Sequence, residues 1–230
     1  MTPKQFKALL VAGQPFYPPS DPSHDWNHVC RVFAYAEALR EKEGGDHDVI
    51  AAAVIFHDCV NYPKNDPRRN LSAGHSAKAA GEVLRNLDFP REKIPLVQTC
   101  IAEHSFSAGI TPQCIESKIV QDADRLESTG IVSLMRTFAS CGTMGRELFN
   151  WQDPFCESHK PDSSKWGLDL AYARLLKVTD TLNTPTARVI GQAHRRRIEQ
   201  FLGLLKEELR PFPTHHKEWF STPGVEQGLD

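Results

Sequence analysis

The signals of β-structure are almost absent from this sequence, which has no sustained alternation of β-branched residues and no Asn-Gly or Asp-Gly hairpin turn. No apolar run approaches the length of a membrane span, and no secretory hydrophobic stretch follows Met1. The formal net charge is only −2, which argues against bulk electrostatic binding to nucleic acid. We therefore expect a cytoplasmic protein that has no membrane segment and binds no nucleic-acid polymer.

Disulfide and zinc-ribbon patterns are also missing, because the 6 cysteines are scattered without a Cys-x-x-Cys pair. This usage is typical of reduced thiols in a cytoplasmic protein. Cys59 directly follows a His-Asp pair, so it is a possible ligand or redox-sensitive thiol. A small buried side chain is the simpler interpretation of that cysteine.

Helical periodicity accounts for most of the chain and predicts an all-α fold. Thr2 is a suitable N-cap, and Pro3 suits the first helical position. Pro63 and Pro67 exclude a continuous helix over residues 61–71. The predicted helices cover residues 3–12, 25–43, 47–59, 72–87, 91–104, 112–127, 130–140, 165–181 and 185–210.

A metal centre is indicated by His57 and Asp58, which stand together at the end of the apolar helical run 51–56. His28 and Asp124 complete the candidate set on two other predicted helices. Mixed nitrogen and oxygen ligands suit hard to borderline divalent ions. Two neutral imidazoles and two carboxylates would leave open positions on a six-coordinate ion for water and substrate. Without an ion, the two carboxylates would repel each other.

The sequence around these residues resembles the HD-domain superfamily of metal-dependent phosphohydrolases. The resemblance lies in residues 24–32 (HDWNHVCRV), 53–58 (AVIFHD), 101–106 (IAEHSF) and 122–126 (DADRL). Residues 175–184 (LLKVTDTLNT) are similar to the C-terminal part of one bacterial branch of small predicted HD hydrolases. The resemblance implies a single-domain HD-type helical bundle with additional C-terminal helices.

The resemblance also implies that His28, His57, Asp58 and Asp124 are the metal ligands. Asp122 is the rival for the fourth place, but the aspartate directly before Arg-Leu is the usual ligand of the family. We expect one divalent ion per chain, chosen from Mn, Mg, Co, Ni and Fe, with Mn favoured. Several family members carry a catalytic glutamate a few positions after the His-Asp pair. This chain has no carboxylate there before position 66, so Asp58 or the activated water is left as the base.

We expect the chain to form one domain that consists of four parts. Residues 1–23 are expected to form a helix and a Pro-rich loop packed on the core, and residues 24–140 the metal-binding core. Residues 141–210 would add an irregular loop and C-terminal helices to the same domain, and residues 211–230 a tail. The apolar faces of the last two helices could pack internally or form a homodimer.

Two candidates for binding a phosphorylated substrate lie on the predicted helices near the metal centre. Arg31 lies one turn after His28, and its alternative role is a core salt bridge with Asp58 or Asp124. His104 ends an apolar helix and is a candidate for the same cleft. Its alternatives are a cap of that helix or a ligand of a second metal ion.

Two further candidates, Lys64 and Arg69, lie in the proline-interrupted loop that follows the metal pair. A loop beside a rigid site is a suitable place for substrate contacts. Solvated surface charge is the alternative for each of them.

The preferred function is therefore hydrolysis of a small phosphorylated substrate by metal-activated water. A nucleotide is the expected substrate, and nucleoside triphosphate pyrophosphatase is the specific activity that the branch resemblance suggests. One alternative is an HD-fold di-iron oxygenase, which would need His104 and either His75 or His24 as additional ligands. The other is a regulatory module that retains a metal and binds a nucleotide without turnover.

Overall fold

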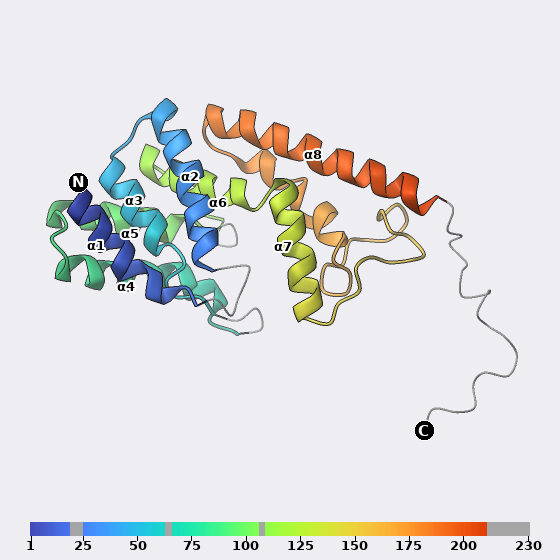
Figure 1. Ribbon diagram of the computed structural model, residues 1–230, viewed down its shortest axis with the longest axis horizontal. Helices are drawn as coiled ribbons and strands as arrows, with labels where there is room; N and C mark the ends of the chain where they lie inside the picture. Colours follow the sequence, from blue (N-terminus) through green and yellow to red (C-terminus); the bar gives the residue numbers. More distant parts are fainter. Residues whose placement is uncertain (19–24, 63–65, 106–108, 211–230) are drawn as a thin grey trace, which may run out of the picture.

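The computed structural model describes residues 1–18, 25–62, 66–105 and 109–210. The predicted all-α fold class is confirmed, because these residues form helices and loops, and their only strand-like pairing is the isolated bridge between Glu147 and Trp166. Figure 1 shows two gatherings of helices, with α1 to α6 at one end and α7 with most of α8 at the other. None of the described helices is long and apolar enough to cross a membrane.

The helix boundaries follow the predicted periodicity closely in the first part of the chain. The α-helices are α1 (Pro3–Gly13), α2 (Trp26–Glu43), α3 (His47–Phe56), α4 (Ser72–Asn86), α5 (Ile94–Glu103), α6 (Ile115–Glu127), α7 (Gly130–Thr143) and α8 (Pro185–Leu209). Thr2 forms a capping box with Gln5 at the start of α1, and Asp25 caps α2 by accepting a hydrogen bond from the His28 amide. Short polar side chains therefore fix the beginnings of these two helices.

The predicted continuous helix over residues 165–181 is wrong. The chain instead forms a π-helical turn, η5 (Ala171–Leu175), followed by a 3-10 turn, η6 (Val178–Thr181). Gly167 lies before these turns and packs so tightly that an added Cβ would come within 2.5 Å of the Cys141 sulfur. The segment is therefore shaped by contacts with α7, which override its local helical periodicity.

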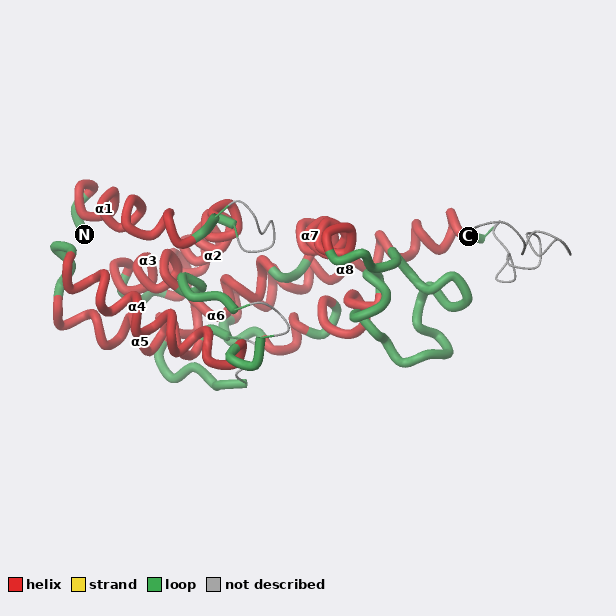
Figure 2. The backbone as a smooth tube through the Cα atoms, turned by 90° about the horizontal axis from the view of Figure 1, so that it is seen from below, coloured by secondary structure: helices red, strands yellow, loops and turns green. Residues whose placement is uncertain are grey.

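Two separate apolar clusters form the interior. The larger cluster is built mainly from α1 to α6, includes Phe56 at the end of α3, and also contains Leu182 and Ala187 near the start of α8. The smaller one joins α7, the 168–175 segment and α8 through Leu134, Leu168 and Ile198. Figure 2 shows the corresponding groups of helices side by side along the length of the molecule. Gly130, whose φ of +78° favours glycine, lies at the junction between α6 and α7.

An ion-pair cluster at the start of α3 should make stability depend on pH. The Lys93 ammonium lies 2.8 Å from carboxylate oxygens of both Asp46 and Asp48. Although burial opposes the change, hydrogen bonding to Lys93 contributes to lowering the pKa of Asp48 to about 2. A lowered carboxyl pKa adds stability above the unfolded-state value, and that stability is lost as pH falls through the folded-state value. The contribution should therefore be present near neutral pH and disappear between about pH 4 and pH 2.

We expect Lys93→Met to lower the free energy of unfolding by about 1 kcal/mol near neutral pH. The difference from the wild type should shrink as pH falls, because protonated Asp48 no longer attracts Lys93. Urea unfolding at several pH values measures this difference. Lys78→Met, on an exposed position of α4, is the matched control. A difference that does not change with pH would contradict the electrostatic explanation.

Candidate metal centre

The four predicted ligands come from three helices of the larger cluster. His28 lies in the first turn of α2, and Asp124 lies in the last turns of α6. His57 is the C-cap residue of α3, and Asp58 follows it. The carbonyl groups at the C-terminal end of a helix carry partial negative charge, which favours a cation nearby. The packing of α2 against α3 and α6 brings all four side chains to one place.

The potential ligand atoms face one another at short distances. His28 Nε2 lies 3.1 Å from His57 Nε2. Asp124 Oδ1 lies 3.7 Å from His28 Nε2 and 4.0 Å from His57 Nε2. Asp58 Oδ2 lies 3.6 Å from His57 Nε2. Both imidazoles are buried, whereas the carboxylates are partly exposed, so the set is open to the outside on its acidic side.

The acceptor groups that lie behind the imidazoles indicate which ring nitrogen carries the proton. His57 Nδ1 lies 2.7 Å from the Val54 carbonyl, which can only accept, so Nδ1 donates. His28 Nδ1 faces a carboxylate oxygen of Glu127 at 3.1 Å. In the neutral rings, both Nε2 atoms then present lone pairs to each other. Burial, and then the neighbouring His57, lower the pKa of His28 well below its usual value, which disfavours a proton on His28. A divalent cation would be bound by both lone pairs, so the donor set fits the ion that the sequence predicts.

His104 lies directly beside this set, at the end of α5. Its Nδ1 donates to the Ile101 carbonyl at 2.6 Å, and its Nε2 lies 3.4 Å from Asp58 Oδ1. Burial lowers the pKa of His104, but hydrogen bonding to Asp58 and the charges of Asp58 and Asp124 outweigh burial and raise the pKa to about 9. His104 therefore both caps the C-terminal end of α5 through its imidazole and lines the cleft.

Glu127 is a buried carboxylate behind the centre that the sequence analysis missed. Besides facing His28, it accepts a hydrogen bond from Arg31 Nε at 2.9 Å and forms an ion pair with Arg136. The salt bridge considered for Arg31 therefore exists, but with Glu127 in place of Asp58 or Asp124. Glu127 follows Asp124 by three residues on α6, and this one-turn spacing could have indicated a position near the centre.

Tyr17 supports the centre from a distant part of the sequence. Its buried hydroxyl donates to the Ile55 carbonyl at 2.9 Å and accepts a hydrogen bond from the Asp58 amide at 3.3 Å. The hydroxyl thus satisfies backbone groups at the C-terminal end of α3, where the His57–Asp58 turn begins. No local sequence signal connects Tyr17 with this turn.

Asp122, the rival for the fourth ligand position, has a different set of partners. Its two oxygens accept hydrogen bonds from the Asn183 amide and side chain and from the Thr184 amide and hydroxyl, all at 2.8 Å. Thr184 in turn is the N-cap of α8. Asp122 therefore attaches the start of α8 to α6 and is not turned toward the two imidazoles.

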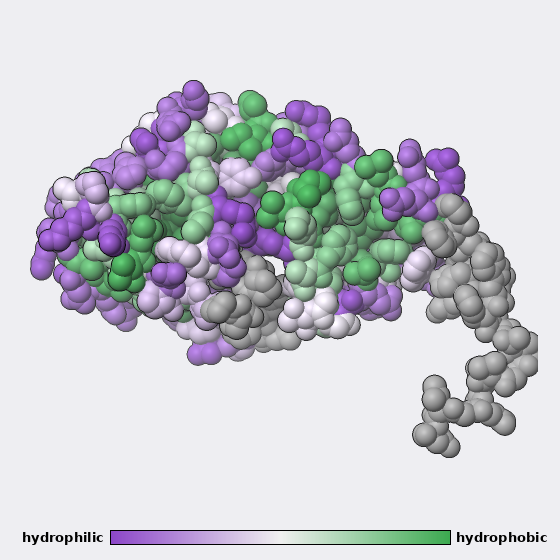
Figure 3. Space-filling model, in the orientation of Figure 1, coloured by the Kyte–Doolittle hydropathy of each residue, from purple (hydrophilic) through white to green (hydrophobic). Residues whose placement is uncertain are grey.

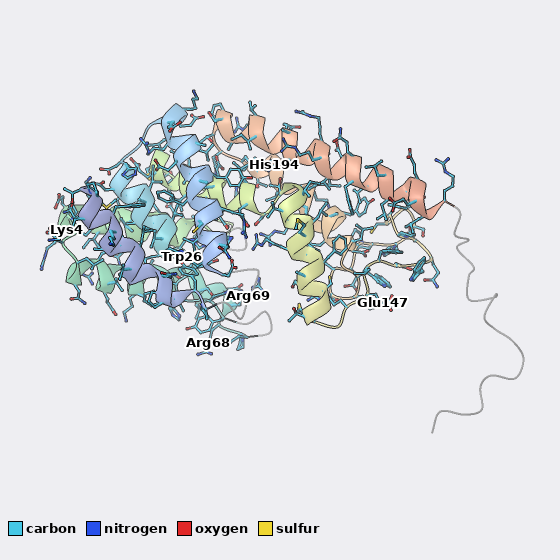
Figure 4. The ribbon with its side chains drawn as sticks, in the orientation of Figure 1. Lys4, Trp26, Arg68, Arg69, Glu147 and His194 are labelled. Atoms are coloured by element: carbon cyan, nitrogen blue, oxygen red, sulfur yellow. The ribbon has the colours of Figure 1, made fainter. Side chains whose placement is uncertain are left out.

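The candidate centre opens into a cleft of about 220 Å³ between the two groups of helices. His28, Asp58, His104 and Asp124 line one end of it. The cleft also contains four arginines, Arg69, Arg136, Arg146 and Arg174, of which the sequence analysis singled out only Arg69. Figure 3 shows hydrophilic side chains between α2 and α7, and Figure 4 shows Arg69 below α2.

Among the remaining predicted site residues, only some belong to the part of the chain that the structure describes. Arg31 is not among the residues that line the cleft, and Lys64 lies outside the described residues. His75, one of the extra ligands that the oxygenase alternative requires, lies 2.9 Å from the Tyr62 hydroxyl through Nδ1. His24, the other, also lies outside the described residues.

Comparison with known proteins gives one family match. The pattern of the HD domain matches residues 25–129, which include all four predicted ligands. YpgQ, an uncharacterized protein of Bacillus subtilis, is 28% identical over 213 residues, which span 90% of this chain and 94% of YpgQ.

Solved structures extend the likeness to almost the whole chain. The structure of YpgQ in complex with ADP aligns with a TM-score of 0.69 and 26% identity, covering 90% of this chain and 96% of YpgQ. Lin1889 of Listeria innocua aligns with a TM-score of 0.69 and 28% identity, covering 91% of this chain and 98% of Lin1889. An HD-superfamily hydrolase of Bacillus thuringiensis aligns with a TM-score of 0.67 and 28% identity, covering 95% and 98% of the two chains.

Proposed function

This chain belongs to the HD-domain superfamily through residues 25–129, and on that premise we propose that it is a divalent-metal-dependent phosphohydrolase that acts on a nucleotide. The observation that carries the proposal is the 3.1 Å approach of the His28 and His57 Nε2 atoms, with Asp58 and Asp124 beside them. These four residues are the metal ligands in this proposal. The hydrolases among the similar structures support the reaction class.

The cleft arginines support an anionic substrate of small size. Arg69, Arg136, Arg146 and Arg174 line the same cleft as the proposed ligands, and guanidinium groups suit phosphate oxygens. The ADP bound to YpgQ supports a nucleotide. We propose more specifically a nucleoside triphosphate, hydrolysed to a nucleoside monophosphate and pyrophosphate, with the cleft arginines as the groups that would contact its phosphates.

The proposed reaction assigns separate roles to the metal ligands, to the Asp58–His104 pair and to the cleft arginines. A divalent ion at the centre supplies polarisation of a phosphoryl oxygen and a lowered pKa of water. Asp58 Oδ1 and His104 Nε2, 3.4 Å apart, form the pair that holds a proton at the edge of the cleft. Burial lowers the pKa of Arg174. The charge of Asp124 partly offsets this effect and the charge of Arg69 adds to it, so Arg174 lies within electrostatic reach of both groups. The arginines orient the phosphates and offset charge that develops on them.

The test is a substrate screen on the purified protein with Mn²⁺, in which nucleoside mono-, di- and triphosphates and cyclic nucleotides are supplied separately and the products are identified. Release of pyrophosphate from a triphosphate is the expected result. Release of inorganic phosphate alone would contradict the proposed pyrophosphatase reaction. If none of these compounds is hydrolysed, the proposed phosphohydrolase function is wrong.

Arg69 provides a variant that tests the substrate side of the proposal. We expect Arg69→Ala to lower kcat/KM about 10- to 100-fold, the size of one lost charge-assisted hydrogen bond. Arg68→Ala is the matched control, because Arg68 pairs with Asp66 at 2.7 Å and lies over the Tyr62 ring. Both arginines are labelled in Figure 4. Equal losses in the two variants would indicate a general effect of surface charge.

A further inference from the structure

A second group of metal-binding side chains lies in the loop between α7 and η5, well separated in sequence from the HD centre. Cys156, His159 and Asp169 each offer one ligand atom, and these atoms all lie within 4.8 Å of one another. Figure 1 shows this loop beside α7, at the end of the molecule away from α1. The three residues are not among those that line the cleft.

The turn that carries Cys156 and His159 is built around Asp153. One carboxylate oxygen of Asp153 accepts a hydrogen bond from the Glu157 amide at 2.8 Å, and the other accepts from the Ser158 and His159 amides. The second oxygen also lies 2.8 Å from His159 Nδ1. With its Nδ1 bound to a carboxylate, His159 directs Nε2 toward Cys156 and Asp169. A carboxylate behind the imidazole is the usual arrangement for a histidine that binds a metal.

Asp169 gives the independent reason to expect a cation. Its side chain is fully buried, with 0% exposure. Oδ2 accepts a hydrogen bond from the Asp162 amide at 2.7 Å and lies 2.9 Å from His159 Nε2. Oδ1 is also buried and has no hydrogen-bond partner among the described residues, and the carboxylate lies close enough to the Cys156 thiol to contribute to raising the pKa of that thiol, after burial. A buried carboxylate oxygen without a partner is unfavourable and calls for an explanation such as a bound ion.

The sulfur–nitrogen spacing is close to that of a transition-metal site, whereas His159 Nε2 and Asp169 Oδ2, at 2.9 Å, would have to move slightly apart to bind one ion. Cys156 Sγ lies 3.8 Å from His159 Nε2, and the sulfur–nitrogen distance expected around a tetrahedral zinc ion is about 3.5 Å, from bond lengths of about 2.3 and 2.0 Å. Cys156 also has a φ of +52°, a backbone conformation that residues other than glycine adopt infrequently. One sulfur, one nitrogen and one oxygen donor favour Zn²⁺ or Co²⁺ over Mg²⁺ or Ca²⁺.

We propose that Cys156, His159 and Asp169 bind a transition metal ion of the Zn²⁺ type and thereby link the 153–159 turn to the start of η5. Leu170, Arg174 and Leu175 follow directly after Asp169 and line the cleft. The ion would therefore fix one wall of the cleft, in addition to the metal at the HD centre. The competing arrangement is a purely ionic one, with a protonated His159 bridging Asp153 and Asp169.

Cobalt distinguishes the two arrangements, because thiolate ligation of Co²⁺ gives a near-ultraviolet charge-transfer band that histidine and carboxylate ligands do not give. We expect Co²⁺ titration of the full-length protein to produce this band and Cys156→Asn to abolish it. Asparagine tolerates the positive φ of this position, so the variant should keep the turn. Cys30→Ser, which removes an exposed thiol on α2, should keep the band.

Metal analysis after loading with Zn²⁺ supplies a second measurement. The wild type should retain one more equivalent of zinc per chain than Cys156→Asn. Cys156→Asp, which restores an anionic ligand, should recover the zinc but give no sulfur band with cobalt. A missing band in the wild type, or equal zinc contents in the wild type and Cys156→Asn, would overturn the proposal and leave the ion-pair arrangement. Neither result depends on whether the HD centre hydrolyses a nucleotide.

Discussion

Asp124→Asn is expected to abolish metal binding at the HD centre and to lower turnover by roughly 10³-fold or more, the order seen when one group that stabilises transition-state charge is removed. Although burial opposes it, the neighbouring imidazoles, with His57 the largest influence, lower the pKa of Asp124, so a carboxylate is the favoured form at this position. Asparagine keeps the size of the side chain but supplies no negative charge. Metal analysis and steady-state kinetics on the purified variant measure the two losses.

Asp122→Asn is the matched control, since it makes the same chemical change two residues away. This variant should keep its metal, because Asp122 holds the Asn183–Thr184 segment and not an ion. It should instead lose about 2–3 kcal/mol of unfolding free energy, since hydrogen bonds to a buried charge are broken. The opposite result, with metal lost from Asp122→Asn and retained by Asp124→Asn, would show that the fourth ligand has been assigned to the wrong aspartate.

Glu127→Gln is expected to have the largest effect on stability. The variant leaves Arg31 and Arg136 without the buried carboxylate they share and should lower the free energy of unfolding by about 3–5 kcal/mol. It should also weaken metal binding about 10- to 100-fold, because the Glu127 carboxylate lies 3.1 Å from His28 Nδ1 and helps to orient the imidazole. Urea unfolding of the metal-free protein and competition with a metal chelator separate these two effects.

Glu82→Gln, at an exposed position of α4, controls for the chemical change itself and should alter neither quantity. Weaker stability with unchanged metal affinity would mean that Glu127 only pairs with the arginines. In that case it would not position His28.

The sequence allowed the fold class and the four proposed ligands to be predicted, because both depend on local patterns. Helical periodicity and caps such as Asp25 mark where helices begin, and the HD motifs carry His28, His57 and Asp58 in recognisable surroundings. The choice of Asp124 over Asp122 also rested on a local context, the Arg-Leu that follows it.

The supporting residues could not be predicted, because they act through contacts between distant segments. Tyr17 contacts the end of α3 because the N-terminal segment packs against that helix, and its hydroxyl donates to the Ile55 carbonyl. Arg146 and Arg174 enter the cleft from the loop after α7 and from a π-helical turn, and neither lies in a motif. The predicted helix over 165–181 is wrong for the same reason, because contacts with the distant helix α7 determine the backbone conformation of that segment.

The cleft is formed by two stretches of chain: one contributes the proposed metal ligands, and the other contributes most of the arginines. All four proposed ligands belong to the helices of the larger cluster, whereas Arg136, Arg146 and Arg174 lie beyond Gly130. Under the proposed function, the metal ligands and most of the cleft arginines would therefore come from consecutive portions of the sequence, with Arg69 as the exception. We expect that exchanging residues 131–182 between relatives would change substrate preference while the four proposed ligands stay in place.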